Sequence, residues 1–349
     1  MRIVQVIKPV GMGGVERIVC SLNNEIENIG EESYILINEK QYDCFIQHFD
    51  IENKKNIIKY CDASLLKMFF DLRSKIKMLK PDIIQTHARK ECVFVCLLNK
   101  RAIHIRTQHM SERPRHKVTK IEKILLKNRV SAWIATSESL KKDYLYTKDY
   151  IDPNKCYVVY NGVQDLVKEK KVFDFKNEYC IISRLTKQKG IDILIDSIKA
   201  MNKEDLHFHI DIYGEGDELD NIRALINKYN LSEIIKYVGR TNNPAKIAKK
   251  YDVLLMPSRN EGLPLTMLEV MSVGTPVAIH NVGCVNEIIE NDKNGWIIDG
   301  NYTWNDFFKR DNNNYALICQ NAVETFRNKF SENKMVASYI NIYKKLIRI

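Results

Sequence analysis

Short apolar runs alternate with longer amphipathic segments along the first half of the chain. Helical spacing of apolar residues predicts helices that include residues 15–29 and 67–80. Between such segments, strand-like runs are expected at residues 3–7, 34–37, 83–86, 103–107, 133–135 and 156–160. Strands that alternate with helices predict a mostly parallel, doubly wound α/β sheet.

A second alternating series follows a polar, lysine-rich connector at residues 164–177. Its strand-like runs are residues 179–183, 206–213, 235–238, 253–256, 277–279 and 296–298. Because the series is separate, it predicts a second Rossmann-like domain. A chain of 349 residues is also too long for one typical core. We expect domains at residues 1–165 and 166–328, followed by a final helix at residues 329–349.

Composition is that of a globular protein, with 45% hydrophobic and 28% charged residues. No run approaches the ~20 apolar residues of a spanning helix, and the N-terminus reads as a strand, not as a signal peptide. The nine cysteines contain no CxxC pair, Cys92 and Cys96 being the closest, so the sequence suggests neither a zinc site nor a disulfide framework. A reducing cytoplasm is expected.

The formal net charge of +10 is concentrated in two stretches, residues 67–80 and 117–129, which also carry apolar residues at helical spacing. Such helices can lie on an anionic membrane surface. They can equally be the solvated faces of ordinary packed helices. Nucleic-acid binding is disfavoured, because the positive charge has no interleaved aromatic platform.

The richest chemistry follows the expected strand at residues 252–256. Pro264 suits the first position of a helix, which places Glu261 in the preceding loop and Glu269 in the second turn. The amides of Leu265 and Thr266 would then face an anion such as a diphosphate, while the two carboxylates accept hydrogen bonds from hydroxyls. Phosphate beside hydroxyls describes a nucleotide sugar. The alternative is that both glutamates are solvated surface residues.

Three other loops follow predicted strands in the same way. Arg184 and Lys189 offer positive charge for a diphosphate, in a loop that could otherwise be plain surface. Glycines at residues 11, 13 and 14 precede a predicted helix. They do not form a dinucleotide-binding fingerprint, because Glu16 occupies the position of its third glycine. The loop is therefore either a phosphate-binding turn or a simple tight turn. Gly214 would let the chain pass close to a nucleotide.

Two histidines, His87 and His109, end strand-like runs, where either can hydrogen-bond a sugar hydroxyl or phosphate or serve a structural role. The basic loop that follows contains Arg113 and Arg115. This loop contacts an acceptor phosphate in one interpretation and is solvated surface in the other.

The string EGLPLTMLEVMSVGTPV at residues 261–277 resembles the E-x7-E signature of retaining GT-B glycosyltransferases, most closely family 4. The resemblance implies two Rossmann-like domains facing a cleft and a last helix that packs back on the first. It implies that Glu261 contacts the donor sugar and that Glu269 binds the ribose hydroxyls. The donor-binding stretch also includes Gly262, Leu263, Pro264, Leu265 and Thr266.

Further residues match other motifs of this family. Arg184 and Lys189 match an R-x4-K-G motif that binds the donor diphosphate. Gly13, Gly14 and Glu16 match a G-G-x-E loop that faces the donor phosphates and the acceptor. His109 matches a histidine beside the transferred sugar, and His87 a less constant one. The stretch at residues 283–287 departs from the usual G-G-x-x-E, because Cys284 replaces the second glycine, which puts the local turn in doubt.

The resemblance therefore predicts a retaining transferase that moves a hexosyl or N-acetylhexosaminyl group. The expected donor is a UDP-sugar, with GDP-mannose as runner-up. The expected acceptor is a lipid-linked glycan or polysaccharide in capsule, O-antigen or lipopolysaccharide synthesis at the cytoplasmic face of the membrane. No metal or other cofactor is expected, since the chain contains no DxD triplet. Alternatives are an epimerase of the same fold and a non-catalytic nucleotide-sugar-binding protein.

Overall fold

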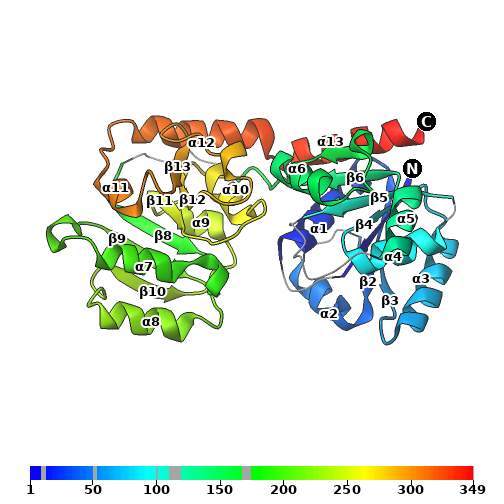
Figure 1. Ribbon diagram of the computed structural model, residues 1–349, viewed down its shortest axis with the longest axis horizontal. Helices are drawn as coiled ribbons and strands as arrows, with labels where there is room; N and C mark the ends of the chain where they lie inside the picture. Colours follow the sequence, from blue (N-terminus) through cyan, green and yellow to red (C-terminus); the bar gives the residue numbers. More distant parts are fainter. Residues whose placement is uncertain (9–12, 50–52, 100, 110–118, 167–173, 349) are drawn as a thin grey trace. The chain divides into compact units, whose positions relative to one another are not determined.

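The structure, a computed structural model, describes residues 1–8, 13–49, 53–99, 101–109, 119–166 and 174–348. It divides into two compact units (Figure 1). Unit 1 comprises Met1–Asn161 and Glu332–Ile349, and unit 2 comprises Gly162–Ser331. The predicted domain boundaries at residues 165 and 328 stay predictions.

Unit 1 contains a seven-stranded parallel sheet of order β3-β2-β1-β4-β5-β6-β7 in its described residues. Its strands are β1 (Arg2–Ile7), β2 (Glu32–Asn38), β3 (Ile57–Tyr60), β4 (Ile83–Thr86), β5 (Ile103–Gln108), β6 (Ala132–Ala135) and β7 (Cys156–Val158). Its helices include α1 (Gly14–Asn28), α2 (Glu39–His48), α3 (Leu65–Leu79), α4 (Arg89–Leu98), α5 (Lys120–Arg129), α6 (Glu138–Thr147) and α13 (Glu332–Ile347). The sequence did not predict β3, a four-residue run whose lysine interrupts the apolar pattern.

Helices cover both faces of the unit 1 sheet, which explains why its strands read as continuous apolar runs. Successive side chains of a strand point to opposite faces. Val4 and Val6 accordingly pack on one side with Met68 of α3. Ile35 and Ile37 pack on the other side with other apolar side chains.

The last helix, α13, belongs to unit 1. Tyr343 of α13 donates a hydrogen bond to Gln85 of β4, and Gln85 donates to Thr107 of β5 at 2.7 Å. Ser21 of α1 also donates to Glu332 at the start of α13. The two buried bonds attach the end of the chain to the sheet of unit 1, and the partly buried Ser21–Glu332 bond attaches it to α1.

Unit 2 contains a six-stranded parallel sheet of order β10-β9-β8-β11-β12-β13 in its described residues. Its strands are β8 (Glu178–Ile182), β9 (His209–Tyr213), β10 (Ile235–Gly239), β11 (Val253–Met256), β12 (Val277–His280) and β13 (Gly295–Ile298). Its helices are α7 (Ile191–Lys199), α8 (Leu219–Lys228), α9 (Pro244–Ala248), α10 (Leu265–Ser272), α11 (Trp304–Lys309) and α12 (Tyr315–Lys329). Its core joins strand residues such as Ile181 and Ile212 to Leu194 and Phe307 from the helices.

Each sheet reverses its strand order once, next to its first strand. The reversal lies between β1 and β4 in unit 1 and between β8 and β11 in unit 2. Open α/β sheets bind ligands at the carboxyl ends of the strands at such a switch point. The two switch points are therefore the first places to look for a site.

Candidate functional site

The loops after β8 and β11 meet at the switch point of unit 2. Lys189 Nζ donates a hydrogen bond to Glu261 Oε1 at 2.7 Å, and Ser258 Oγ donates to the same oxygen at 2.6 Å. The side chains of Lys189 and Glu261 are 15% and 7% exposed. A largely buried pair of opposite charges thus lies where a doubly wound sheet binds its ligand.

Arg259 connects the loop after β11 to the segment after β8 through hydrogen bonds. Its guanidinium donates to both carboxylate oxygens of Asp192, over 2.7 and 2.8 Å, and its backbone N–H donates to the Gln188 carbonyl at 2.8 Å. The Arg259 hydrogen bonds hold the pKa of Asp192 well below its usual range. Bidentate pairing fixes orientation as well as distance, so it holds the loop that carries Lys189 against the loop that carries Glu261.

Arg184 lies on the same loop as Lys189, but its side chain is exposed. None of the described carboxylates forms an ion pair with it. Gly214, after β9, packs against this loop with φ +148, and a Cβ there would lie 1.8 Å from the Ser183 carbonyl oxygen. Only glycine allows this close approach.

Because the Arg184 side chain is exposed and pairs with no described carboxylate, its guanidinium is available to a ligand.

Helix α10 begins at Leu265, with Pro264 as its N-cap in an extended conformation. The prediction that Pro264 is the first helical residue is therefore wrong by one position. No side chain in the described part of the chain caps this helix. The first N–H groups of a helix have no acceptor within it, and they give its N-terminus a partial positive charge. The amides of Leu265 and Thr266 can therefore bind an anion.

Both glutamates of the signature are buried. Glu261 and Glu269 are each 8% exposed, and Glu269 lies in the second turn of α10 as predicted. The alternative that they are solvated surface residues is wrong.

Gly283 and Cys284 support the Glu261 loop from the neighbouring strand end. Gly283 has φ +63, and a Cβ on it would lie 2.2 Å from the Glu261 carbonyl oxygen. Cys284 Sγ donates to the Gly262 carbonyl at 3.0 Å. The cysteine that departs from the family pattern therefore contributes a hydrogen bond to this loop, and the turn forms.

At the switch point of unit 1, α1 begins just after Gly13. The Gly13 N–H donates to Glu16 Oε2 at 3.1 Å, and Glu16 is 4% exposed. Glu16 thus caps its own helix. Gly14 is the first residue of α1. The part of this glycine loop at residues 9–12 lies outside the described residues.

His87 and His109 lie side by side after β4 and β5. Their rings stack with centroids 5.2 Å apart, and His87 Nδ1 lies 2.9 Å from His109 Nε2. On its other side, His87 Nε2 lies 2.8 Å from Gln5 Oε1, in the middle of β1. An amide oxygen only accepts, so His87 carries its proton on Nε2 and presents a lone pair at Nδ1.

The tautomer of His87 also fixes the tautomer of His109. His109 Nε2 must donate to His87 Nδ1, which leaves His109 Nδ1 without a proton. That atom is buried, and no described residue hydrogen-bonds to it. Burial and the nearby Arg106 charge lower the pKa of His109 to about 3, and burial together with His109 lowers that of His87 well below its usual value. The pair is neutral at pH 7 and offers a hydrogen-bond acceptor.

The structure brings predicted residues together in each unit. Lys189 meets Glu261 in unit 2, and His87 meets His109 in unit 1. Arg113 and Arg115 lie outside the described residues. Sequence reasoning missed Ser258, Asp192 and Gln5. Ser258 lies just before the E-x7-E string, and Asp192 and Gln5 had no sequence signal because their partners come from distant segments.

Two family descriptions match consecutive parts of the chain. "Glycosyltransferase Family 4" matches residues 12–165, and "Glycosyl transferases group 1" matches residues 163–330. Anabaena HepE, solved in complex with UDP, superposes with a TM-score of 0.84 at 16% identity over 99% of this chain and 100% of HepE. The fold is that of a two-domain GT-B glycosyltransferase. Within this class, the chain belongs to glycosyltransferase family 4, as its motifs predicted.

Relatives by sequence carry the same class name. The chain is 28% identical over 354 residues to an uncharacterized glycosyltransferase, MJ1178, of Methanocaldococcus jannaschii. This alignment covers 96% of this chain and 95% of MJ1178. It is 29% identical over 210 residues to the Escherichia coli O-antigen biosynthesis glycosyltransferase WclY. This second alignment covers 57% of this chain and 58% of WclY.

Proposed function

We propose that this protein transfers a hexosyl or N-acetylhexosaminyl group from a nucleotide diphosphate sugar to a hydroxyl, with retention of anomeric configuration. One observation carries the proposal: the Lys189–Glu261 pair and the Arg184 guanidinium lie at the switch point of unit 2, in the loops after β8 and β11. Positive charge beside a buried carboxylate suits a diphosphate attached to a sugar.

Different residues of unit 2 bind different parts of the donor. Arg184, Lys189 and the N-terminus of α10 neutralise the diphosphate as it leaves, which is the largest electrostatic contribution to the transfer. Glu261 binds the donor sugar, and Glu269 binds the ribose hydroxyls. We propose that these positive groups balance the charge of the diphosphate by themselves, so that transfer needs no metal ion.

In unit 1, we propose that substrate binding uncovers the buried His109 Nδ1, which then accepts a hydrogen bond from a substrate hydroxyl. His87 and Gln5 keep that atom unprotonated. A neutral acceptor distinguishes a hydroxyl from a phosphate oxygen, which has no proton to donate when ionised. This supports a role for His109 beside a sugar, with Glu16 and His87 on the acceptor side.

A UDP-sugar is the favoured donor and GDP-mannose the second candidate. HepE, a protein of the same fold, was solved with UDP. We propose a lipid-linked glycan or polysaccharide acceptor in O-antigen, capsule or similar surface-glycan synthesis, which the similarity to WclY supports.

An acceptor held in a membrane favours an enzyme at the inner membrane surface. No helix among the described residues is long and apolar enough to cross a membrane. Helices α3, α4 and α5 are neighbours in unit 1, and they expose Leu66 (72%), Phe70 (60%), Ile121 (80%) and Ile124 (62%). Exposed lysines and arginines lie on α3 and α5 as well. Apolar side chains among cations suit an anionic lipid surface.

Product analysis tests the proposed activity. The protein is incubated with UDP-sugars and GDP-mannose, with and without a saccharide acceptor. Transfer predicts acceptor-dependent release of the nucleoside diphosphate. An isomerised nucleotide sugar without acceptor would identify an epimerase instead, and donor binding with neither product would identify a binding protein.

Vesicle flotation tests the membrane surface separately. We expect the protein to float with anionic vesicles at low salt, and Ile121→Ser together with Leu66→Ser to reduce the bound fraction several-fold. Leu317→Ser, at an exposed apolar position on α12 of unit 2, is the matched control. Equal flotation of all three proteins, or none at all, contradicts the assignment of this surface.

A further inference from the structure

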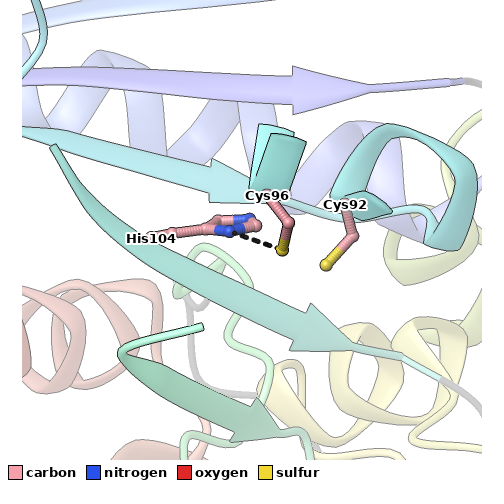
Figure 2. Close-up of side chains that lie close together, drawn as sticks. All are labelled: Cys92, Cys96 and His104. Carbon is pink, nitrogen blue, oxygen red and sulfur yellow. Dashed lines mark hydrogen bonds between the residues drawn. The ribbon is translucent and has the colours of Figure 1, made fainter. Parts of the chain in front are cut away.

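Two cysteines and a histidine meet inside unit 1, and none of the three is assigned to the proposed transfer. Cys92 and Cys96 are one turn apart on α4, so their side chains leave the same face of the helix. His104 reaches them from β5 (Figure 2). All three are buried, with exposures of 2%, 2% and 1%. Their two sulfur atoms and one ring nitrogen lie within 4.8 Å of one another.

These distances are close to those around a metal ion. With Zn–S bonds of about 2.3 Å and Zn–N bonds of about 2.0–2.1 Å, a tetrahedral site places sulfur about 3.6 Å from nitrogen and about 3.8 Å from a second sulfur. Cys96 Sγ lies 3.4 Å from His104 Nδ1. Shifts of less than about 1 Å would let all three atoms bind one ion, because each side chain can rotate about its χ1 angle.

The hydrogen bonds of His104 prepare Nδ1 as a ligand. Thr86 Oγ1 donates its single proton to the Ile105 carbonyl at 3.3 Å, so it accepts from His104 Nε2 at 3.1 Å. Nε2 therefore carries the ring proton, and the Nδ1 lone pair points toward Cys96. Histidines that bind metals are oriented in this way by a partner on the other ring nitrogen.

The ligand types select the kind of ion. The group offers two sulfurs and one imidazole and no oxygen, which excludes Mg²⁺ and Ca²⁺ as suitable occupants. Two thiolates and a neutral imidazole would balance the charge of a divalent ion inside a core formed with Leu126 and Trp133. Thiolate and imidazole ligands suit Zn²⁺ and Cu⁺.

We propose that Cys92, Cys96 and His104 bind one thiophilic cation, Zn²⁺ or Cu⁺, that ties α4 to β5. The three proposed ligands are different residues from those assigned to the proposed transfer, for which we propose no metal. It was missed in the sequence because the C-x3-C spacing matches no common zinc motif, and the third ligand follows eight residues later on a strand.

Metal titration of the full-length, reduced protein tests this site. Co²⁺ added to metal-free protein should give a thiolate-to-metal charge-transfer band that saturates at one equivalent. Zn²⁺ should then displace it, and Cu⁺ is tested in a separate competition with a chromophoric chelator. We expect Cys92→Ala and Cys96→Ala to abolish the band. Thr86→Val should weaken binding about 10–100-fold, because it removes the partner of Nε2.

Cys20→Ala, at another buried cysteine of unit 1, is the matched control and should bind like the wild type. Chelator should lower the melting temperature of the metal-loaded wild type and leave Cys96→Ala unchanged. Absence of the Co²⁺ band and of any Zn²⁺ or Cu⁺ binding in the wild type overturns the proposal, whether or not the variants fold. Binding that persists in Cys92→Ala and Cys96→Ala overturns it equally.

Discussion

Units 1 and 2 share a doubly wound sheet, yet they place different chemistry at the same topological position. At the switch point of unit 2, Lys189 and Glu261 form an ion pair in a site that also contains Arg184. At the switch point of unit 1, Gln5, His87 and His109 form a neutral chain of hydrogen bonds. The same fold therefore carries an ion pair at one switch point and a neutral hydrogen-bond chain at the other, and in the proposed function these bind a ligand by charge and by hydrogen bonds, respectively.

The largest difference is expected when charge is removed from unit 2. Arg184→Ala and Lys189→Met should each lower the transfer rate about 10²–10³-fold, because each loses a preorganised positive group at the diphosphate. Lys187→Met is the matched control, since Lys187 lies on the same loop but pairs with Asp192. Steady-state rates of nucleoside diphosphate release measure the effect. Rates within a factor of three of wild type in Arg184→Ala and Lys189→Met would refute the assignment.

The neutral site of unit 1 should make stability depend on pH. The pKa values of His87 and His109 are lowered on folding, so their contribution is complete above the unfolded value of about 6.5 and is lost as the pH falls below it, for His109 toward its folded pKa of about 3. Protonation of His109 should lower the free energy of unfolding by about 2 kcal/mol between pH 7 and pH 5, and His87 should add to this loss in the same direction. Unfolding in urea at both pH values measures this.

A double variant with His87→Leu and His109→Leu removes both titrating groups. It should lose most of this pH dependence, whereas His209→Leu, at an exposed histidine of unit 2, should retain it. An unchanged pH dependence in the double variant would show that the two rings are not buried in neutral form.

Gln5→Leu tests the hydrogen-bond chain itself. Without the amide oxygen, His87 no longer has a fixed tautomer, and the rate should fall about tenfold, the equivalent of one hydrogen bond of about 1.4 kcal/mol. Nitrogen-15 spectra of the wild type should show His109 protonated at Nε2 and bare at Nδ1. Gln47→Leu, at an exposed position on α2, is the control. A His109 proton on Nδ1 in the wild type would contradict the proposed direction of the chain.

The smallest effect is expected from Cys284→Gly, which restores the glycine of the family pattern. It removes one hydrogen bond to the Gly262 carbonyl and should change the free energy of unfolding by less than about 1 kcal/mol, with a rate near that of wild type. Thermal unfolding and the transfer rate measure it. Loss of transfer would mean that Cys284 has a role beyond this loop.

The same comparison shows what the sequence can predict. Alternating patterns located most strands, and the E-x7-E string identified the family and both buried glutamates. The patterns could not reveal β3, because four residues carry little periodicity. They could not pair Arg259 with Asp192, 67 residues apart, or Gln5 with His87, 82 residues apart. Such contacts depend on strand order, which local residue patterns do not contain.

Nucleotide affinity tests the central claim most directly. Calorimetric titration compares UDP and GDP with their monophosphates in wild type, Lys189→Met and Lys187→Met. We predict that one diphosphate binds the wild type at least about tenfold more tightly than its monophosphate, a gain of about 1.4 kcal/mol from the second phosphate. This preference should shrink in Lys189→Met and persist in Lys187→Met. Equal affinity for monophosphate and diphosphate in the wild type would contradict a diphosphate site at the ends of β8 and β11.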